Sequence, residues 1–86
     1  MRLIATIPHP NISITVFQIN DKYVVKLEGG PMEQTFKFTA EEVKGVDDIK
    51  NLMDAEFMRK AIERFNEMYI SLKEAKERFE KSDKLA

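Results

Sequence analysis

Histidine and serine are the residue types in this chain best suited to acid–base or nucleophilic chemistry. His9 is the only histidine, and it lies between two prolines. A serine nucleophile would need this histidine as its base and a sharp glycine-flanked turn that exposes the hydroxyl. None of Ser13, Ser71 and Ser82 has such a turn around it. We interpret His9 as an exposed bend residue and expect no catalytic residue.

Metal and phosphate sites find equally little support. Asp47 and Asp48 are adjacent, without the alternating oxygen ligands and the glycine of a calcium loop. Zinc would find one imidazole and no thiolate, because the chain has no cysteine. A phosphate-binding loop connects a strand to a helix, whereas Gly29-Gly30 joins two predicted strands. We expect no metal, no cofactor and no enzymatic activity.

Composition restricts the class of protein further. The 86 residues suffice for one domain, residues 1–86, and 43% are hydrophobic, as in ordinary globular proteins. Fourteen basic and fifteen acidic residues leave a formal charge of −1, which disfavours a dedicated binder of duplex DNA or anionic membranes. No segment approaches the ~20 apolar residues of a membrane span, and no signal-peptide core is present. We expect a cytoplasmic protein.

The pattern of apolar residues, which predicts the secondary structure, changes near Val43. Residues 1–38 alternate apolar and polar side chains, which predicts an antiparallel meander of three to four strands. Turn signals at Asn20-Asp21 and Gly29-Gly30-Pro31 separate the later strands. The alternation places on one face Ile12, Ile14, Val16, Tyr23, Val25, Leu27, Phe36 and Phe38.

Residues 39–45 are predicted to form a capping turn, in which Thr39 and Glu42 make a capping box. Asp47 and Asp48 offer a second N-cap at the start of a long helix over residues 46–86, which contains no proline or glycine. Asp54 provides an alternative start, which would break the helix after Met53. The apolar residues at helical spacing are Ile49, Leu52, Met53, Phe57, Ala61, Phe65, Met68, Leu72, Ala75 and Phe79. The fold class is therefore α+β.

The helix is too long for its sheet. Residues 48–81 as one helix would span about 50 Å, whereas strands of this length span about 23–30 Å. The apolar stripe nevertheless continues to Phe79. We expect a homodimer in which the distal helices pack together, and the alternative is a monomer with a frayed C-terminal end. The predicted interface residues are Phe65, Met68, Tyr69, Leu72 and Phe79.

The opposite face of the sheet carries mixed side chains: Thr15, Phe17, Ile19, Val24, Lys26, Thr35 and Lys37, with Glu28 and Glu33 among them. Aromatic and basic residues on an open sheet can bind single-stranded nucleic acid. The residues that would do so are Phe17, Lys22, Lys26 and Lys37. In the alternative, the apolar members pack against the first strand, the capping turn or a partner subunit. A strand meander that dimerises through a following helix resembles the topology of Whirly-type single-strand binders.

A second resemblance involves the segments 22–28 and 33–38 and the helix start Asp47-Asp48-Ile49-Lys50. Together they resemble a group of small uncharacterised bacterial proteins, over roughly residues 12 to 70. This resemblance implies the fold and brings no activity, cofactor or site residue. We therefore expect a non-enzymatic homodimeric interaction module, with a single-strand nucleic-acid binder as the alternative. An accessory subunit for an unidentified protein partner is a third possibility.

Overall fold

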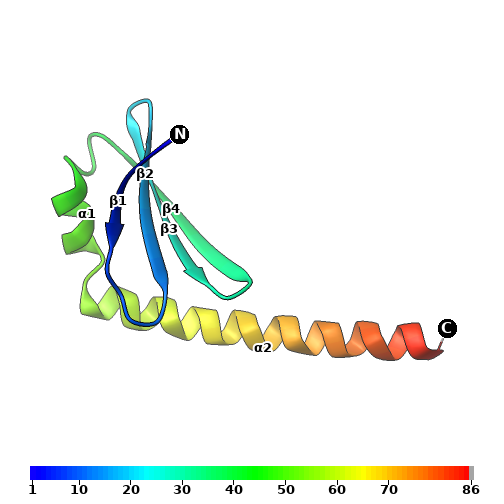
Figure 1. The fold of residues 1–86 in the computed structure, drawn as a ribbon. Helices are drawn as coiled ribbons and strands as arrows, with labels where there is room; N and C mark the ends of the chain where they lie inside the picture. The colour runs from blue at the N-terminus through cyan, green and yellow to red at the C-terminus, as the bar shows by residue number, and fades with distance from the viewer. Residues whose placement is uncertain (86) are drawn as a thin grey trace.

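The computed structural model describes the backbone of residues 1–85 and the side chains of residues 1–82. Its four strands form one antiparallel sheet in the order β1-β2-β3-β4 (Figure 1). The strands are β1 (Arg2–Ile7), β2 (Ser13–Ile19), β3 (Lys22–Gly29) and β4 (Met32–Thr39). Two helices follow, α1 (Val46–Leu52) and α2 (Ala55–Leu85). The predicted α+β class and the meander are confirmed.

Two-residue turns join the last three strands. Ile19 pairs with Lys22 across one turn, and Gly29 pairs with Met32 across the other. Asn20 has φ 53° and Gly30 has φ 62°. These positive φ angles match the twist of a two-residue hairpin, and asparagine and glycine adopt them most readily.

The alternation of residues along the strands separates two faces of the sheet. The face toward the helices buries Ile14, Val16, Val25 and Leu27 almost completely. They pack with a second group of buried residues, supplied by the helices and the segment before them: Val43, Ile49, Met53, Met58, Ala61 and Phe65. The other face carries no helix. We call it the open face. Along each strand, the residues predicted for this face occupy the positions between those that point into the core.

Strand β1 is the less regular edge of the sheet. Its pairing with β2 shifts in register between Leu3 and Ala5. Ile4 falls at this shift and packs, half-buried, against the core. The other edge, β4, pairs with β3 over its whole length without a shift.

The capping turn is confirmed, and the second cap is corrected. Thr39 N donates to Glu42 Oε1 at 3.1 Å, and Glu42 N donates to Thr39 Oγ1 at 3.3 Å. The N-cap of α1, however, is Gly45, which makes no side-chain cap hydrogen bond. Asp47 and Asp48 lie inside the first turn, where their negative charges stabilise the positive end of the helix dipole.

The long helix predicted from residue 46 is broken, as the alternative based on Asp54 anticipated. Met53 ends α1, and its N–H donates to Ile49 O at 3.0 Å. Asp54 caps α2, since its Oδ1 accepts the Phe57 N–H at 2.9 Å and its carbonyl accepts the Met58 N–H. The break lets α1 and α2 cover different parts of the same core.

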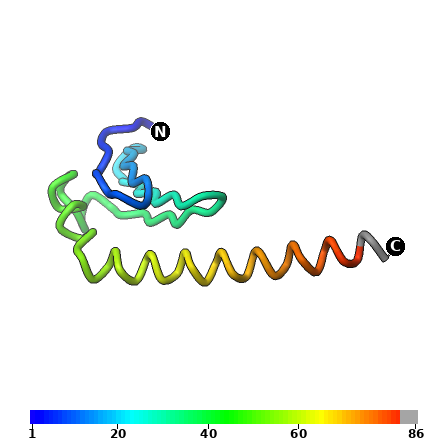
Figure 2. Tube along the Cα trace, turned by 60° about the horizontal axis from the view of Figure 1, so that its bottom comes forward, coloured from blue at the N-terminus to red at the C-terminus, as the bar shows by residue number. Residues whose placement is uncertain are grey.

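Helix α2 has 31 residues, so it is about 46 Å long at about 1.5 Å per residue. The eight residues of β3 span about 26 Å. Figure 2 shows that the whole sheet lies on one side of α2, over its N-terminal part, and that the C-terminal part extends beyond the sheet. None of the helices described is long and apolar enough to cross a membrane.

Candidate interaction surfaces

The apolar positions of α2 follow a 3-4 spacing that continues past the sheet. We call these positions the seam: Met58, Ala61, Phe65, Met68, Leu72, Ala75 and Phe79. Alternating steps of three and four residues keep side chains on one side of a helix, as in helices that pack against a second helix. The seam therefore runs from the part of α2 that the sheet covers to the part that extends beyond the sheet.

The N-terminal part of the seam is covered by the chain's own sheet. Phe65 is 6% exposed, and its ring lies against Gly29, where an added Cβ would already be in van der Waals contact with it. Met68 is half-buried and packs against the same core. The structure thus places two residues of the predicted dimer interface, Phe65 and Met68, wholly or partly inside the subunit.

A polar contact that the sequence did not reveal joins the sheet to α2. Gln34 on β4 donates through Nε2 to Ala61 O at 2.9 Å, and its Oε1 accepts from Arg64 Nε at 2.9 Å. The Arg64 guanidinium also lies over the Phe57 ring, 5.6 Å from its centroid. Only the assembled fold brings Gln34 to α2, since no local pattern distinguishes it from other strand glutamines.

The C-terminal part of the seam has no cover. The side chain of Leu72 is 36% exposed and that of Phe79 is 72% exposed, and Tyr69 is half-exposed beside them. We call residues 69–82 the distal segment. Figure 1 shows this part of α2 running past the β3–β4 hairpin. The structure therefore confirms the geometric mismatch on which the dimer prediction rests, while the dimer itself stays a prediction.

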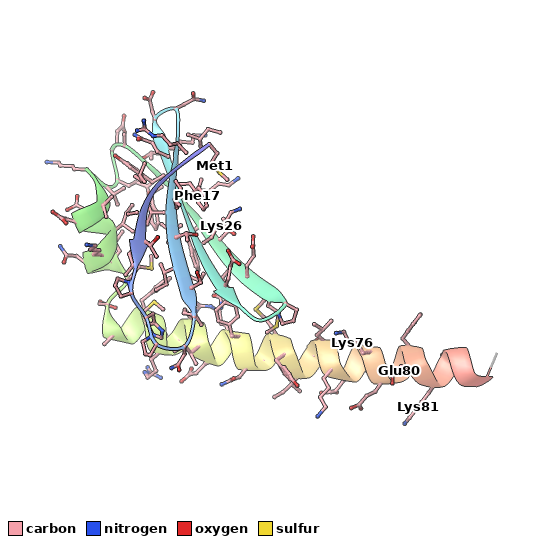
Figure 3. The ribbon with its side chains drawn as sticks, in the orientation of Figure 1. Met1, Phe17, Lys26, Lys76, Glu80 and Lys81 are labelled. Atoms are coloured by element: carbon pink, nitrogen blue, oxygen red, sulfur yellow. The ribbon has the colours of Figure 1, made fainter. Side chains whose placement is uncertain are left out.

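A groove of about 240 Å³ marks the place where the sheet ends on α2. The hairpin residue Pro31 lines one wall, and the distal segment lines the other with Tyr69, Leu72, Lys73, Lys76, Glu77 and Glu80. In Figure 3, Lys76 lies on the side of α2 that faces the sheet, whereas Lys81 points away from it. Two lysines and two glutamates thus share the side of the helix that carries Leu72.

Residues of opposite charge are spaced four apart along the distal segment, but they do not form salt bridges. The sequence pairs Lys73/Glu77, Glu74/Arg78, Lys76/Glu80 and Glu77/Lys81 are separated by four residues, but none forms a salt bridge in the structure. Among the described side chains, the salt bridges are Arg59–Glu63 at 2.7 Å and Lys60–Glu56 at 3.8 Å. Both lie in the N-terminal half of α2.

The open face forms the second candidate surface. A groove of about 600 Å³ brings together Lys22, Lys26 and Lys37, three of the four residues predicted to bind nucleic acid. Apolar side chains line part of it: Met1, Ile19 and Val24. Met1 was not predicted for this surface, because the sequence does not show that the end of β1 reaches this groove.

The fourth predicted residue, Phe17, is already in contact with one of the lysines. Lys26 Nζ lies 5.2 Å from the centroid of the Phe17 ring, which is a cation–π arrangement. Figure 3 labels the two residues next to each other on the sheet. Acidic residues also line the groove, namely Asp21 and Glu33. A base could stack on Phe17 only after Lys26 moves, and the net positive charge of the groove is small.

The residues first considered for chemistry do not form a reactive cluster. His9 Nδ1 accepts the backbone N–H of Asn11 at 3.2 Å, as a bend residue would. No hydrogen bond joins His9 to Ser13, Ser71 or Ser82 within the described part of the chain. The same part contains no group of three or more His, Cys, Asp or Glu side chains placed to hold a metal ion.

Neither a protein-family model, nor a curated protein, nor a solved structure matched the chain when it was compared with all three. The resemblances to the small bacterial proteins and to the Whirly-type topology therefore stay predictions. The surfaces themselves carry the functional argument.

Proposed function

We propose that the protein is a non-enzymatic interaction module that works as a homodimer through the distal segment of α2. The observation that carries the proposal is the seam. Phe65 is 6% exposed under the sheet, whereas Phe79, two heptads further along the same seam, is 72% exposed. An exposed apolar stripe of this kind favours association with another apolar surface.

Burial of the distal seam explains how a second subunit would stabilise the protein. An 86-residue chain buries a smaller share of its surface than a larger domain, so a subunit interface adds stability that the single core lacks. Residues outside the subunit's own core make up the proposed interface: Tyr69, Leu72, Ala75 and Phe79. Since the composition points to the cytoplasm, the dimer would act there.

Sedimentation of the wild-type chain, one double variant and one single control variant tests this proposal. We expect the wild-type chain to form dimers at micromolar concentrations and Leu72→Ala/Phe79→Ala to sediment mainly as a monomer. Ile70→Ala is the matched control, because Ile70 is also exposed, at 56%, but is not part of the seam. A wild-type chain that sediments as a monomer at every concentration would contradict the proposal.

The open face supports a second candidate function, binding of single-stranded nucleic acid. The groove that gathers Lys22, Lys26 and Lys37 beside Phe17 is the observation in its favour. Lysines that contact phosphates make binding salt-dependent, and a free aromatic ring adds stacking. The acidic residues in the groove and the contact of Lys26 with Phe17 place this function second.

Fluorescence anisotropy with a labelled single strand tests the second candidate. Binding at low salt should weaken in Lys26→Ala/Lys37→Ala and persist in Lys44→Ala/Lys50→Ala, which removes the same charge outside the sheet. Absence of binding to any single strand at low salt would eliminate this function and leave the dimer proposal unaffected.

A further inference from the structure

The open face carries an apolar cluster that is separate from the core. Val24 is only 6% exposed, although it lies on this face and is not one of the residues of the core cluster. The strand register places Leu3 and Phe17 in one row with Val24, so apolar side chains continue across β1, β2 and β3. Leu3 at the end of this row and Ile19 beside it are 54% and 40% exposed. The cluster therefore ends in apolar surface that the subunit itself does not cover.

Three lysines border this cluster on the side of β3 and β4. Lys37 is directly opposite Val24 in the register, and Lys22 and Lys26 lie two residues before and after Val24 on β3. All three therefore surround Val24 on one face of the sheet, and all three line the groove of about 600 Å³. Among the described side chains, none of these lysines forms a salt bridge. The centre of the groove is thus a place where positive charge is not neutralised by the subunit.

The acidic residues of the groove lie at its two ends. Asp21 is in the turn before Lys22, and Glu33 pairs with Glu28 at the other end of β3. A polyanion that follows the lysines along the strands would meet a carboxylate at either end, whereas one anionic group at the centre meets lysines only. The charges therefore favour a ligand with a single anionic group over a nucleic acid strand.

The dimensions of the open face fit a ligand that also has an apolar chain. The groove has a volume within the range of sites that bind small molecules, about 300–1,000 Å³. From β4 to β1 the sheet is about 14 Å wide, since three strand spacings of about 4.8 Å separate its four strands. A chain that lies across the strands, with its anionic end at Lys37 and its other end at Leu3, passes over the row of apolar side chains.

We propose that the open face binds a linear acyl chain that ends in one carboxylate. Lys22 and Lys37 hold the carboxylate, and the chain packs on Val24, Ile19 and Leu3. Burial of the chain against the apolar cluster supplies affinity, and the lysines select the negatively charged end. The site lies on the side of the sheet that faces away from α2, so the proposal does not depend on the homodimer.

Decanoate is the probe, because its extended length is comparable with the width of the sheet. In a titration followed by heteronuclear NMR, decanoate should shift the amide signals of β2 and β3 around Val24 in a saturable manner. Decanol and decyltrimethylammonium retain the chain but remove or reverse the charge, so they should bind about fivefold more weakly or worse. Hexanoate retains the carboxylate but buries fewer methylene groups, so it should bind about tenfold more weakly or worse.

Substitution of the lysines tests the position of the carboxylate. Lys22→Gln/Lys37→Gln should weaken the binding of decanoate about fivefold or more, since it removes two charges beside the headgroup and leaves the contact of Lys26 with Phe17 in place. Lys44→Gln/Lys50→Gln removes the same charge outside the sheet and is the matched control. All four substituted side chains are exposed, so both variants should fold as the wild-type chain does.

The outcomes separate this site from the other surfaces of the molecule. Equal binding of decanoate and decanol, or an equal loss in the two lysine variants, would overturn the proposal, because the charge would then have no role. Shifts confined to the distal segment, and absent in Leu72→Ala/Phe79→Ala, would overturn it by placing the chain on α2. A labelled single strand that binds the open face and is not displaced by decanoate would overturn it in favour of the nucleic-acid function.

Discussion

At the scale of single residues, Gln34 shows how a polar side chain can order two elements at once. Its amide donates to a carbonyl of α2 and accepts from Arg64 of the same helix. The hydrogen bond to Ala61 O is partly buried, so it contributes more to stability than the exposed hydrogen bond from Arg64. Gln34 therefore fixes where along α2 the β4 strand crosses.

Replacing this residue should destabilise the subunit itself. We expect Gln34→Ala to lower the free energy of unfolding by about 1–2 kcal/mol, because the variant loses two hydrogen bonds and leaves Arg64 without its acceptor. Urea unfolding of dilute protein measures this change. Thr35→Ala is the neighbouring control, since Thr35 is exposed and its hydroxyl contacts only Glu33. An equal loss in both variants would show that Gln34 has no special role.

At the scale of elements, the strands and turns were predictable from sequence because their causes are local. The alternation of Ile14 and Val16 with polar neighbours defines a strand face, and the positive φ of Gly30 suits a glycine turn. The capping box of Thr39 and Glu42 is likewise encoded within four residues. Local chemistry therefore determined most of the fold.

Features of the candidate surfaces that depend on assembly were harder to predict. Helical spacing placed Phe65 and Phe79 on one stripe, but it did not show where the sheet stops covering that stripe. The contact between Lys26 and Phe17 depends on the pairing of β2 with β3. The N-cap of α1 also differs from the prediction, because the helix is capped by Gly45 and not by Asp47 or Asp48.

Asp54 is the residue that separates α1 from α2. We expect Asp54→Ala to lower the free energy of unfolding by about 1 kcal/mol, because it removes the side-chain acceptor of the Phe57 N–H. Asp54→Asn should retain most of the stability, since an amide oxygen can still accept this hydrogen bond. Thermal or urea unfolding of both variants measures the difference, and an alanine variant as stable as the asparagine variant would contradict the capping role.

At the scale of the whole molecule, the subunit has two unequal parts. A folded body of sheet, α1 and the start of α2 buries the core, and the distal segment extends from it (Figure 2). All residues of α2 from 69 to 82 are exposed. The stability of a single body and association through the distal segment therefore depend on different residues, and a variant of the distal segment should leave the stability of the isolated monomer largely unchanged.

This separation predicts how the melting temperature depends on protein concentration. A homodimer is stabilised by mass action, so the wild-type chain should melt several degrees higher when its concentration is raised about 100-fold. Leu72→Ala/Phe79→Ala should melt at one temperature over the same range. Scanning calorimetry or fluorescence at both concentrations checks this, and a wild-type melting temperature that does not change with concentration would argue against association.

The two edges of the sheet bear on how large an assembly can become. The register shift in β1 interrupts the regular row of backbone groups on that edge, and β4 presents the charged side chains Glu33 and Lys37 along the other. Both features discourage strands of other molecules from adding to a sheet. We therefore expect a pair joined through α2 to resist growth into fibres by addition of strands at the sheet edges.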